Sequence, residues 1–151
     1  MEPVTFFQKG EILLGGFWVG SDIGSRWDRY EREEKIAKLS NTVDDSGFEL
    51  RLFLPDELRI FTGVEVSGGE IVPPYELLAL PSAFYAMFEI DCGDDIDRQF
   101  GEVDAWIDGN RDKYGQLKWE SENAPYRIIW AGRYAEENIC EMWIPFLDFR
   151  N

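Results

Sequence analysis

An acidic side chain interrupts an apolar segment close to the end of the chain. In residues 139–146 the two-residue repeat of a strand places Glu141 and Trp143 on one face, with Cys140 and Met142 on the other. Burying an unpaired carboxylate costs free energy, because the charge loses its hydration. Desolvation disfavours the ionised carboxylate, and an arriving cation favours it again. Glu141 and Trp143 are therefore a candidate receptor for a cationic ligand.

A second interpretation of Glu141 is structural. Glutamate is rarely buried without a partner, so this acid is expected either to face water at a sheet edge or to pair with Arg127 or Arg133. In the first interpretation a neighbouring indole adds about 0.5–2 kcal/mol of cation–π attraction for a bound cation. The two interpretations differ in whether the cation beside Glu141 belongs to a ligand or to the protein.

The composition restricts the classes of partner. The chain has 151 residues, with 30 acids against 15 bases and a formal net charge of -15. Nucleic acids and anionic membrane surfaces are bound mainly through clustered Lys and Arg, so direct binding to either is not expected. The negative field of such a protein instead attracts cations and keeps the protein in solution.

Several kinds of site are excluded by what the chain lacks. It contains no His, which removes Ser-His and Cys-His dyads and imidazole metal sites. The acids in residues 91–97 lack the glycine and terminal glutamate of a calcium loop, so no metal and no cofactor is expected. Cys92 and Cys140 lie far apart in the sequence. A disulfide framework is therefore not expected, and Cys140 is interpreted as a small apolar core residue.

The start of the chain carries no targeting signal. It lacks the basic start and apolar middle of a signal peptide, and no apolar run approaches the length of a membrane span. We therefore expect a cytoplasmic protein. The first strand is expected to begin near Glu11, which leaves no room ahead of it for a helix-turn-helix domain.

Hydrophobic periodicity predicts an α+β fold made of tandem β-α-β-β repeats. We expect a single domain over residues 1–151, with pseudo-repeats at about 1–70 and 71–151. Short loops between strand pairs favour an antiparallel sheet, with two main helices on one side. The strands are expected at 11–19, 48–54, 59–66, 75–80, 83–90, 126–131 and 139–146. The helices are expected at 23–39 and 96–114, and residues 41–47 are expected to break the first.

The second predicted helix has a cap and an apolar stripe. Asp94 and Asp95 precede it and supply side-chain oxygens for the first free backbone N–H groups. Trp106 lies just off the stripe. The residues of the stripe, which repeat at helical spacing, are Ile96, Phe100, Val103 and Ile107.

Three short motifs, in this order and spacing, resemble a known family. They are Thr62-Gly63-Val64, Ala124-Pro125-Tyr126 and Glu141-Met142-Trp143-Ile144-Pro145. The chain resembles, over nearly its whole length, the GyrI-like small-molecule-binding domain, which is the effector-binding part of AraC-type and MerR-type multidrug regulators and also occurs as free-standing proteins.

The resemblance implies a cleft for bulky, often cationic, aromatic compounds, built from a buried Glu and stacked aromatic side chains. An acid of the last strand matches Glu141, with Trp143 at the position of an aromatic residue. The acid that the family commonly carries in the penultimate strand is replaced by Ile128, so recognition of a cation depends on one carboxylate.

The aromatic residues have two interpretations, a ligand site and ordinary core packing. In the first, Trp130 and Trp143 form one wall of the site. Trp27 on the first helix, with Phe100 and Trp106 on the second, forms the opposite side. Trp18 either lines the cleft or covers its floor. The expected ligand-binding residues are Glu141, Trp143, Trp130, Ile128, Trp27, Phe100, Trp106 and Trp18.

We expect a stand-alone protein that binds cationic, aromatic, lipophilic small molecules and has no catalytic residues. One alternative is a hydrolase of cyclopropane-bearing toxins, with Glu141 as its general base. Another is an acidic inhibitor of a DNA enzyme such as gyrase. The expected partner is a cationic lipophilic small molecule, with no direct nucleic acid and no membrane, and with a protein partner or a homodimer left open.

Overall fold

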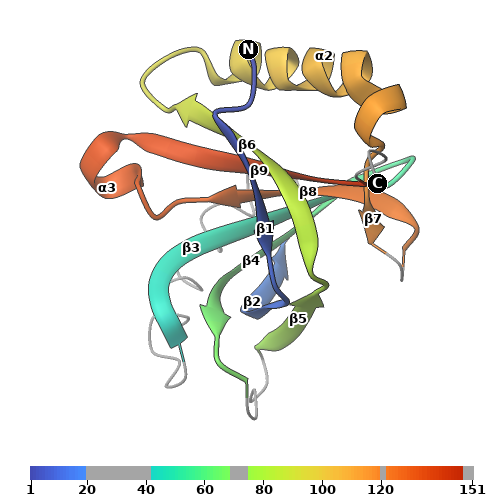
Figure 1. Ribbon diagram of the computed structural model, residues 1–151. Coiled ribbons are helices and arrows are strands. Elements are labelled where there is room, and N and C mark those ends of the chain that lie inside the picture. The colour runs from blue at the N-terminus through green and yellow to red at the C-terminus, as the bar shows by residue number, and fades with distance from the viewer. Residues whose placement is uncertain (20–41, 69–74, 120–121, 148–151) are drawn as a thin grey trace.

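Backbone pairing in the computed structural model defines the architecture (Figure 1). The structure describes residues 1–19, 42–68, 75–119 and 122–147. The helices in these ranges are α2 (Ile96–Tyr114) and the one-turn α3 (Tyr134–Glu137). The strands are β1 (Thr5–Lys9), β2 (Ile12–Val19), β3 (Thr42–Phe53), β4 (Leu58–Val66), β5 (Glu76–Leu80), β6 (Ala83–Asp91), β7 (Lys118–Trp119), β8 (Ala124–Trp130) and β9 (Ile139–Phe146).

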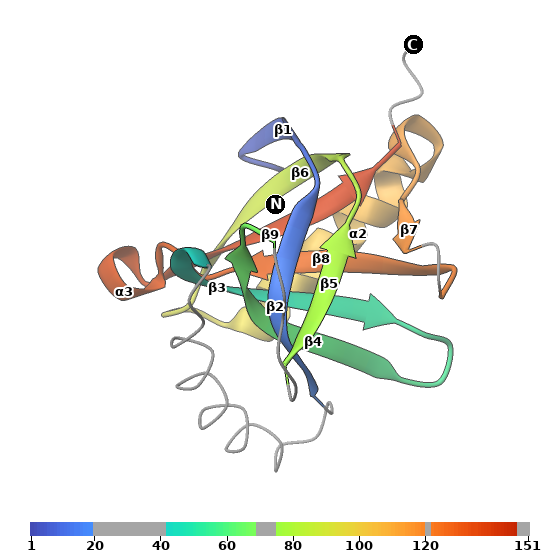
Figure 2. The ribbon, with the colours of Figure 1, turned by 90° about the horizontal axis from the view of Figure 1, so that it is seen from below.

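All the described strand pairs are antiparallel and join into one nine-stranded sheet. The strand order is β1-β6-β9-β8-β3-β4-β2-β5, with β7 added beside β8. The order is symmetric about the β3–β8 contact, and the short strands β1 and β5 each pair with the outer strand of the other half. The sheet curls strongly, and α2 lies across one of its faces (Figures 1 and 2). The α+β, antiparallel prediction is confirmed.

Both faces of β6 and β9 are covered by apolar side chains. On one face Phe88 and Met142 pack with Val103 of α2, and all three are fully buried. On the other face Tyr85 and Trp143 belong to the largest core cluster, which extends across the sheet to β2. Because both faces of β6 are buried, successive residues of this strand are apolar, and apolar residues do not alternate with polar ones.

The N-terminal cap of α2 is as predicted, but the start of its apolar stripe is not. The Asp95 side chain accepts a hydrogen bond from the backbone N–H of Arg98 at 3.1 Å. Ile96, expected in the stripe, is 38% exposed, whereas Gln99 is buried. The Gln99 amide bonds both backbone groups of Asp91, accepting from its N–H at 2.7 Å and donating to its carbonyl at 2.8 Å. Gln99 thereby covers the end of β6, and Ile96 is left at the margin of the contact.

Three further differences separate the structure from the prediction. Strand β3 begins at Thr42, within the segment expected to be irregular, because a shift of register before Gly47 lets the longer strand continue its pairing with β4. Cys140 is half-buried rather than a core residue. Strands β1 and β7 and helix α3 were not predicted. The helix expected at 23–39, with Trp27, lies outside the described residues. No described helix is long and apolar enough to cross a membrane.

Candidate functional site

The register of the sheet brings most of the predicted site residues onto one face. Directly opposed residues of antiparallel strands point to the same side. Ile128 lies opposite Trp143, and Trp130 lies opposite Glu141. Trp18 belongs to the same row as Ile128, because the partners run in order through Trp18, Phe61, Leu50, Ile128 and Trp143. These residues therefore share one face of the sheet, the face that points away from α2.

Glu141 is held by two hydrogen bonds. Its Oε1 accepts from the indole N–H of Trp143 at 2.9 Å, and its Oε2 accepts from Nη1 of Arg133 at 3.1 Å. The side chain of Glu141 is 13% exposed. Both bonds involve an ionised carboxylate, and charge-assisted bonds of this kind are stronger than neutral ones. The carboxylate is therefore oriented and partly neutralised by the protein itself.

Arg133 is shared by three carboxylates. Besides Glu141 it contacts Glu89 at 2.6 Å and Glu137 at 2.7 Å. Glu89 lies directly opposite Glu141 in the β6–β9 pair, an arrangement that is unfavourable for two like charges without a bridging cation. The hydrogen bonds that Arg133 donates to Glu137, Glu89 and Glu141 raise the pKa of Arg133, and the bond that Glu137 accepts lowers the pKa of Glu137. Three negative charges thus surround one positive charge.

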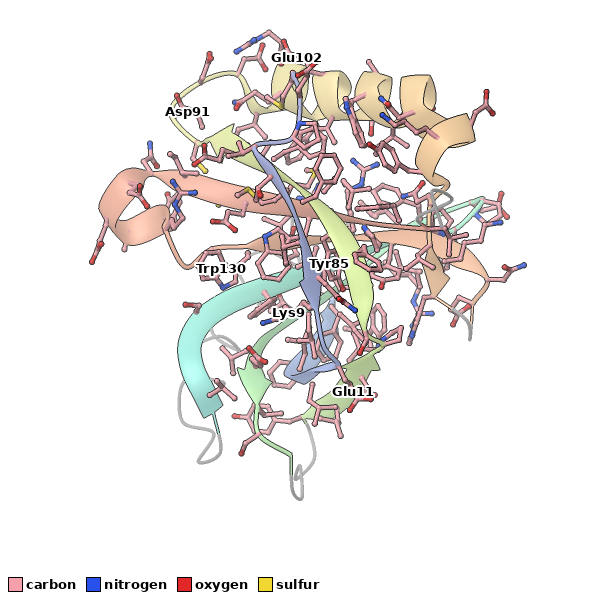
Figure 3. All side chains as sticks on the ribbon, viewed as in Figure 1. Lys9, Glu11, Tyr85, Asp91, Glu102 and Trp130 are labelled. Carbon is pink, nitrogen blue, oxygen red and sulfur yellow. The ribbon has the colours of Figure 1, made fainter. Side chains whose placement is uncertain are left out.

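Aromatic side chains surround Trp143 on the same face. Its ring centroid lies 5.2 Å from Phe7, 5.7 Å from Phe48 and 5.9 Å from Tyr85. The Trp130 ring lies 5.9 Å away, tilted by 30°. With only 6% of its surface exposed, Trp143 orients Glu141 and supports its aromatic neighbours, rather than offering a free ring face. Figure 3 shows Trp130 and Tyr85 on the side of β9 away from α2.

The position of Trp130 depends on Gly132. A Cβ at residue 132 would lie 2.1 Å from an atom of the Trp130 indole, well inside contact distance. The indole therefore rests against the backbone that leads into α3, next to Arg133. Trp130 is half-buried, so its ring is the more accessible of the two indoles beside Glu141.

Two tyrosine hydroxyl groups lie inside this apolar face. Tyr85 and Tyr126 are fully buried, and within the part of the chain that the structure describes neither hydroxyl makes a hydrogen bond of good geometry. Burial raises the pKa of both phenols, and for Tyr85 the neighbouring Tyr126 adds to the rise. Buried polar groups without partners are uncommon and cost free energy. The pair places two hydrogen-bonding groups beneath the aromatic cluster.

Comparison with known proteins yields structural neighbours only. No family model matches the sequence, and no curated protein sequence matches it. SAV2435, solved bound to tetraphenylphosphonium, has a TM-score of 0.70 and 19% identity, covering 97% of this chain and 94% of that one. The C-terminal domain of EcmrR has a TM-score of 0.64 and 12% identity, covering 95% and 96%. The chain has the same fold as these two proteins, which is consistent with the expected GyrI-like fold.

A third neighbour has the same fold. It is described as a bacterial transcription regulation protein from Staphylococcus aureus MU50, with a TM-score of 0.63 and 21% identity, and the match covers 95% of this chain and 97% of that one. The three matches thus extend over nearly the whole length of this chain and of each neighbour.

Phe100 and Trp106 do not join the Glu141 face. Both project from α2 onto the opposite face, where Trp106 contacts Phe88 at 5.4 Å and stacks on Tyr114 at 5.9 Å. The expectation that they form the opposite wall of one site with Glu141 is therefore wrong, because α2 covers the other side of β6 and β9. Trp106 instead lines a shallow depression near the end of α2.

The remaining predicted residues occupy different parts of the sheet. Trp18 shares the Glu141 face but lies at its far end, where its ring contacts Trp119 at 5.6 Å and the Arg59 guanidinium at 4.5 Å. Ile128 is fully buried beneath the cluster. Arg127, one of the two expected partners of Glu141, lies on the α2 face and pairs with Asp104 at 2.9 Å.

Sequence reasoning missed several residues of this face. Phe7 comes from β1, which is too short and too exposed to show a periodic signal. Tyr85 and Glu89 lie on the face of β6 opposite the regular apolar row of Phe84, Ala86, Phe88 and Ile90. A signal was present for Tyr85, since the whole strand is apolar and could have been read as buried on both sides.

Proposed function

We propose that this chain binds cationic, aromatic, lipophilic small molecules on the face of the sheet that carries Glu141, and that Glu141 reads the charge of the ligand. The observation that carries the proposal is the group of Glu89, Glu137 and Glu141 around the single guanidinium of Arg133, beside an aromatic cluster. Three carboxylates against one guanidinium leave a formal excess of two negative charges. This excess attracts a cation even while Arg133 stays in place.

The aromatic neighbours supply the second part of the recognition. A lipophilic cation loses hydration on binding, and contact with aromatic rings offsets that loss through buried apolar area and cation–π attraction. Two half-buried rings of this cluster are accessible: Trp130, which lies opposite Glu141 in the sheet, and Phe7, which contacts Trp143. Support for this ligand class also comes from SAV2435, a protein of the same fold that was solved with tetraphenylphosphonium.

Arg133 takes the place of the ligand cation in the structure described here. It bonds the carboxylate oxygen Oε2 of Glu141, whereas Oε1 stays with Trp143. A cationic ligand would share Glu141 with Arg133 or shift the guanidinium toward Glu89 and Glu137, which both hold it at shorter distances than Glu141 does. The site thus keeps one cation, Arg133, among its carboxylates whether or not a ligand is bound.

The proposal is tested by calorimetric titration with tetraphenylphosphonium and with triphenylphosphine oxide, a neutral compound with similar rings. Glu141→Gln keeps the shape of the side chain and its acceptor for Trp143. Removing one charge-assisted contact costs about 1.5–3 kcal/mol, so we expect the affinity for the cation to fall about 10- to 100-fold. Affinity for the neutral compound should hardly change.

The matched control is Glu102→Gln. Glu102 lies on α2, on the other side of the sheet (Figure 3), and its substitution by Gln removes the same single negative charge as Glu141→Gln. It should leave both affinities as in the wild type. Equal affinity for the two compounds in all three proteins would refute charge reading by Glu141, and a parallel loss in both variants would show that only the overall field of the protein matters.

A further inference from the structure

Two cysteines that are distant in the sequence meet at one end of the sheet. The Sγ atoms of Cys92 and Cys140 lie 3.4 Å apart, and both residues are half-buried free thiols. Cys92 is the first residue after β6, and its backbone N–H donates to the carbonyl of Asn138 at 3.0 Å. Cys140 lies opposite Ile90 in the β6–β9 pair. The β6–α2 turn that holds Cys92 begins after Asp91, which is labelled in Figure 3.

The geometry is close to that of a disulfide. A disulfide requires a distance of about 2.05 Å between the sulfurs, so the two atoms must approach each other by about 1.4 Å. Cys92 and Gly93 form a turn directly after β6. Movement of Cys92 therefore affects at most its own backbone bond to Asn138 at the end of the β6–β9 pair, whereas Cys140 is fixed within β9 and serves as the stationary partner.

We propose that Cys92 and Cys140 form a modification site, a dithiol that a hydroperoxide converts into an intramolecular disulfide. In the first step the thiolate of Cys92 attacks an oxygen of the peroxide. The sulfur–oxygen bond forms, the O–O bond breaks, and the leaving hydroxide or alkoxide takes up a proton. In the second step the sulfur of Cys140 attacks the Cys92 sulfenic acid, the S–S bond forms, and hydroxide leaves with the Cys140 proton as water.

The surroundings assign different roles to the two thiols. Burial raises the pKa of Cys140 to about 12, and the neighbouring Cys92 and the charge of Glu49 add to the rise. Cys140 therefore stays protonated at neutral pH, and Cys92 is the thiol that attacks the peroxide. Because Cys140 lies within contact distance of the resulting sulfenic acid, resolution to the disulfide is intramolecular and precedes further oxidation.

The disulfide would join the turn between β6 and α2 to β9, at the residue next to Glu141. The disulfide is independent of the proposed ligand, because the two sulfurs lie on the α2 face while Glu141 points to the other. Closing a covalent loop between Cys92 and Cys140 restricts the unfolded chain, so the oxidised protein should melt several degrees higher than the reduced protein.

The test treats the purified full chain with hydrogen peroxide in small molar excess, followed by denaturation, maleimide alkylation and intact-mass measurement. The expected product has lost about 2 Da, takes up no maleimide and returns to two free thiols on reduction. A peptide map should join the peptides of Cys92 and Cys140. In Cys140→Ser, Cys92 should stop at the sulfenic acid and be trapped by dimedone, whereas Cys92→Ser should react far more slowly than the wild type.

Three results would overturn the inference: two alkylated thiols per chain after the treatment, disulfide-linked dimers as the main product, or equal oxidation rates in the wild type and in both variants. The wild-type mass and peptide map decide the question by themselves if either serine variant folds poorly. Circular dichroism of each variant before treatment shows whether its rate can be compared with that of the wild type.

Discussion

The hydrogen bond from Trp143 to Glu141 should be measurable as a coupling energy. The indole N–H lies 2.9 Å from Oε1, and hydrogen bonds to charged groups contribute about 1.5–3 kcal/mol. Trp143→Phe removes the donor and part of a buried ring, and Glu141→Ala removes the acceptor. Each single variant also changes packing, so neither free energy of unfolding alone equals the energy of the bond.

A double-mutant cycle separates the bond from the packing. Urea unfolding followed by circular dichroism gives the free energy of unfolding for the wild type, Trp143→Phe, Glu141→Ala and the double variant. We expect the double variant to be less destabilised than the sum of the single variants by about 1–3 kcal/mol. Arg133 still compensates Glu141 in Trp143→Phe, which places the expectation toward the lower end of this range.

Trp106→Phe is the control for the loss of indole volume. Trp106 is partly buried on the α2 face and stacks on Tyr114, without a hydrogen bond to a carboxylate. Combined with Glu141→Ala it should give an additive result, within about 0.5 kcal/mol. Additivity for the Trp143 pair as well would refute the argument that Trp143 orients the carboxylate, and the bond would then count only as a geometric contact.

Two further predictions concern the scaffold. Gly16→Ala should destabilise the protein by more than about 2 kcal/mol, because the new Cβ would lie 2.0 Å from the carbonyl oxygen of Thr62 in the next strand. The control is Gly101→Ala, where nothing lies within 4 Å of the new Cβ, and it should stabilise α2 by about 0.5–1 kcal/mol. A higher urea midpoint for Gly16→Ala than for Gly101→Ala would contradict this argument. Burial raises the folded-state pKa of Tyr85 and Tyr126, so their contribution to stability is complete below the ordinary tyrosine pKa of about 10 and is lost as pH rises above it. Ultraviolet titration should show these two of the six tyrosines ionising only on unfolding, and ionisation of all six near pH 10 in the folded protein would disprove it.

Local patterns predicted the elements that have strong periodicity. The strand at 139–146 and the helix at 96–114 have the predicted bounds, and Asp95 caps the helix. These features depend on neighbouring residues and on the geometry of a single element. The face shared by Glu141 and Trp143 followed from the same two-residue period, and the structure bears it out.

The partners of Glu141 could not be derived in the same way. Glu89 lies opposite Glu141 because β6 and β9 pair across about fifty residues of chain, and their register is set by the sheet as a whole. Arg133 was one of two basic candidates, and the choice between them depends on which face Arg127 takes. The position of the Arg133 side chain is set by the one-turn helix α3, which begins directly after Arg133. This helix ends at Asn138, whose φ of 56° is left-handed. Such a conformation leaves only a weak trace in the sequence.

The exchange of the short strands has a consequence for how the chain folds. β1 precedes β2 in sequence but completes the sheet beside β6, and β5 precedes β6 but completes it beside β2. Each half therefore supplies the other with its outermost strand, and neither half alone can cover its own edge. Unfolding should be cooperative across the entire sheet, without a stable half-folded intermediate. An isolated half would expose an unpaired edge and associate with a second copy of itself, which makes partial proteolysis a route to aggregation.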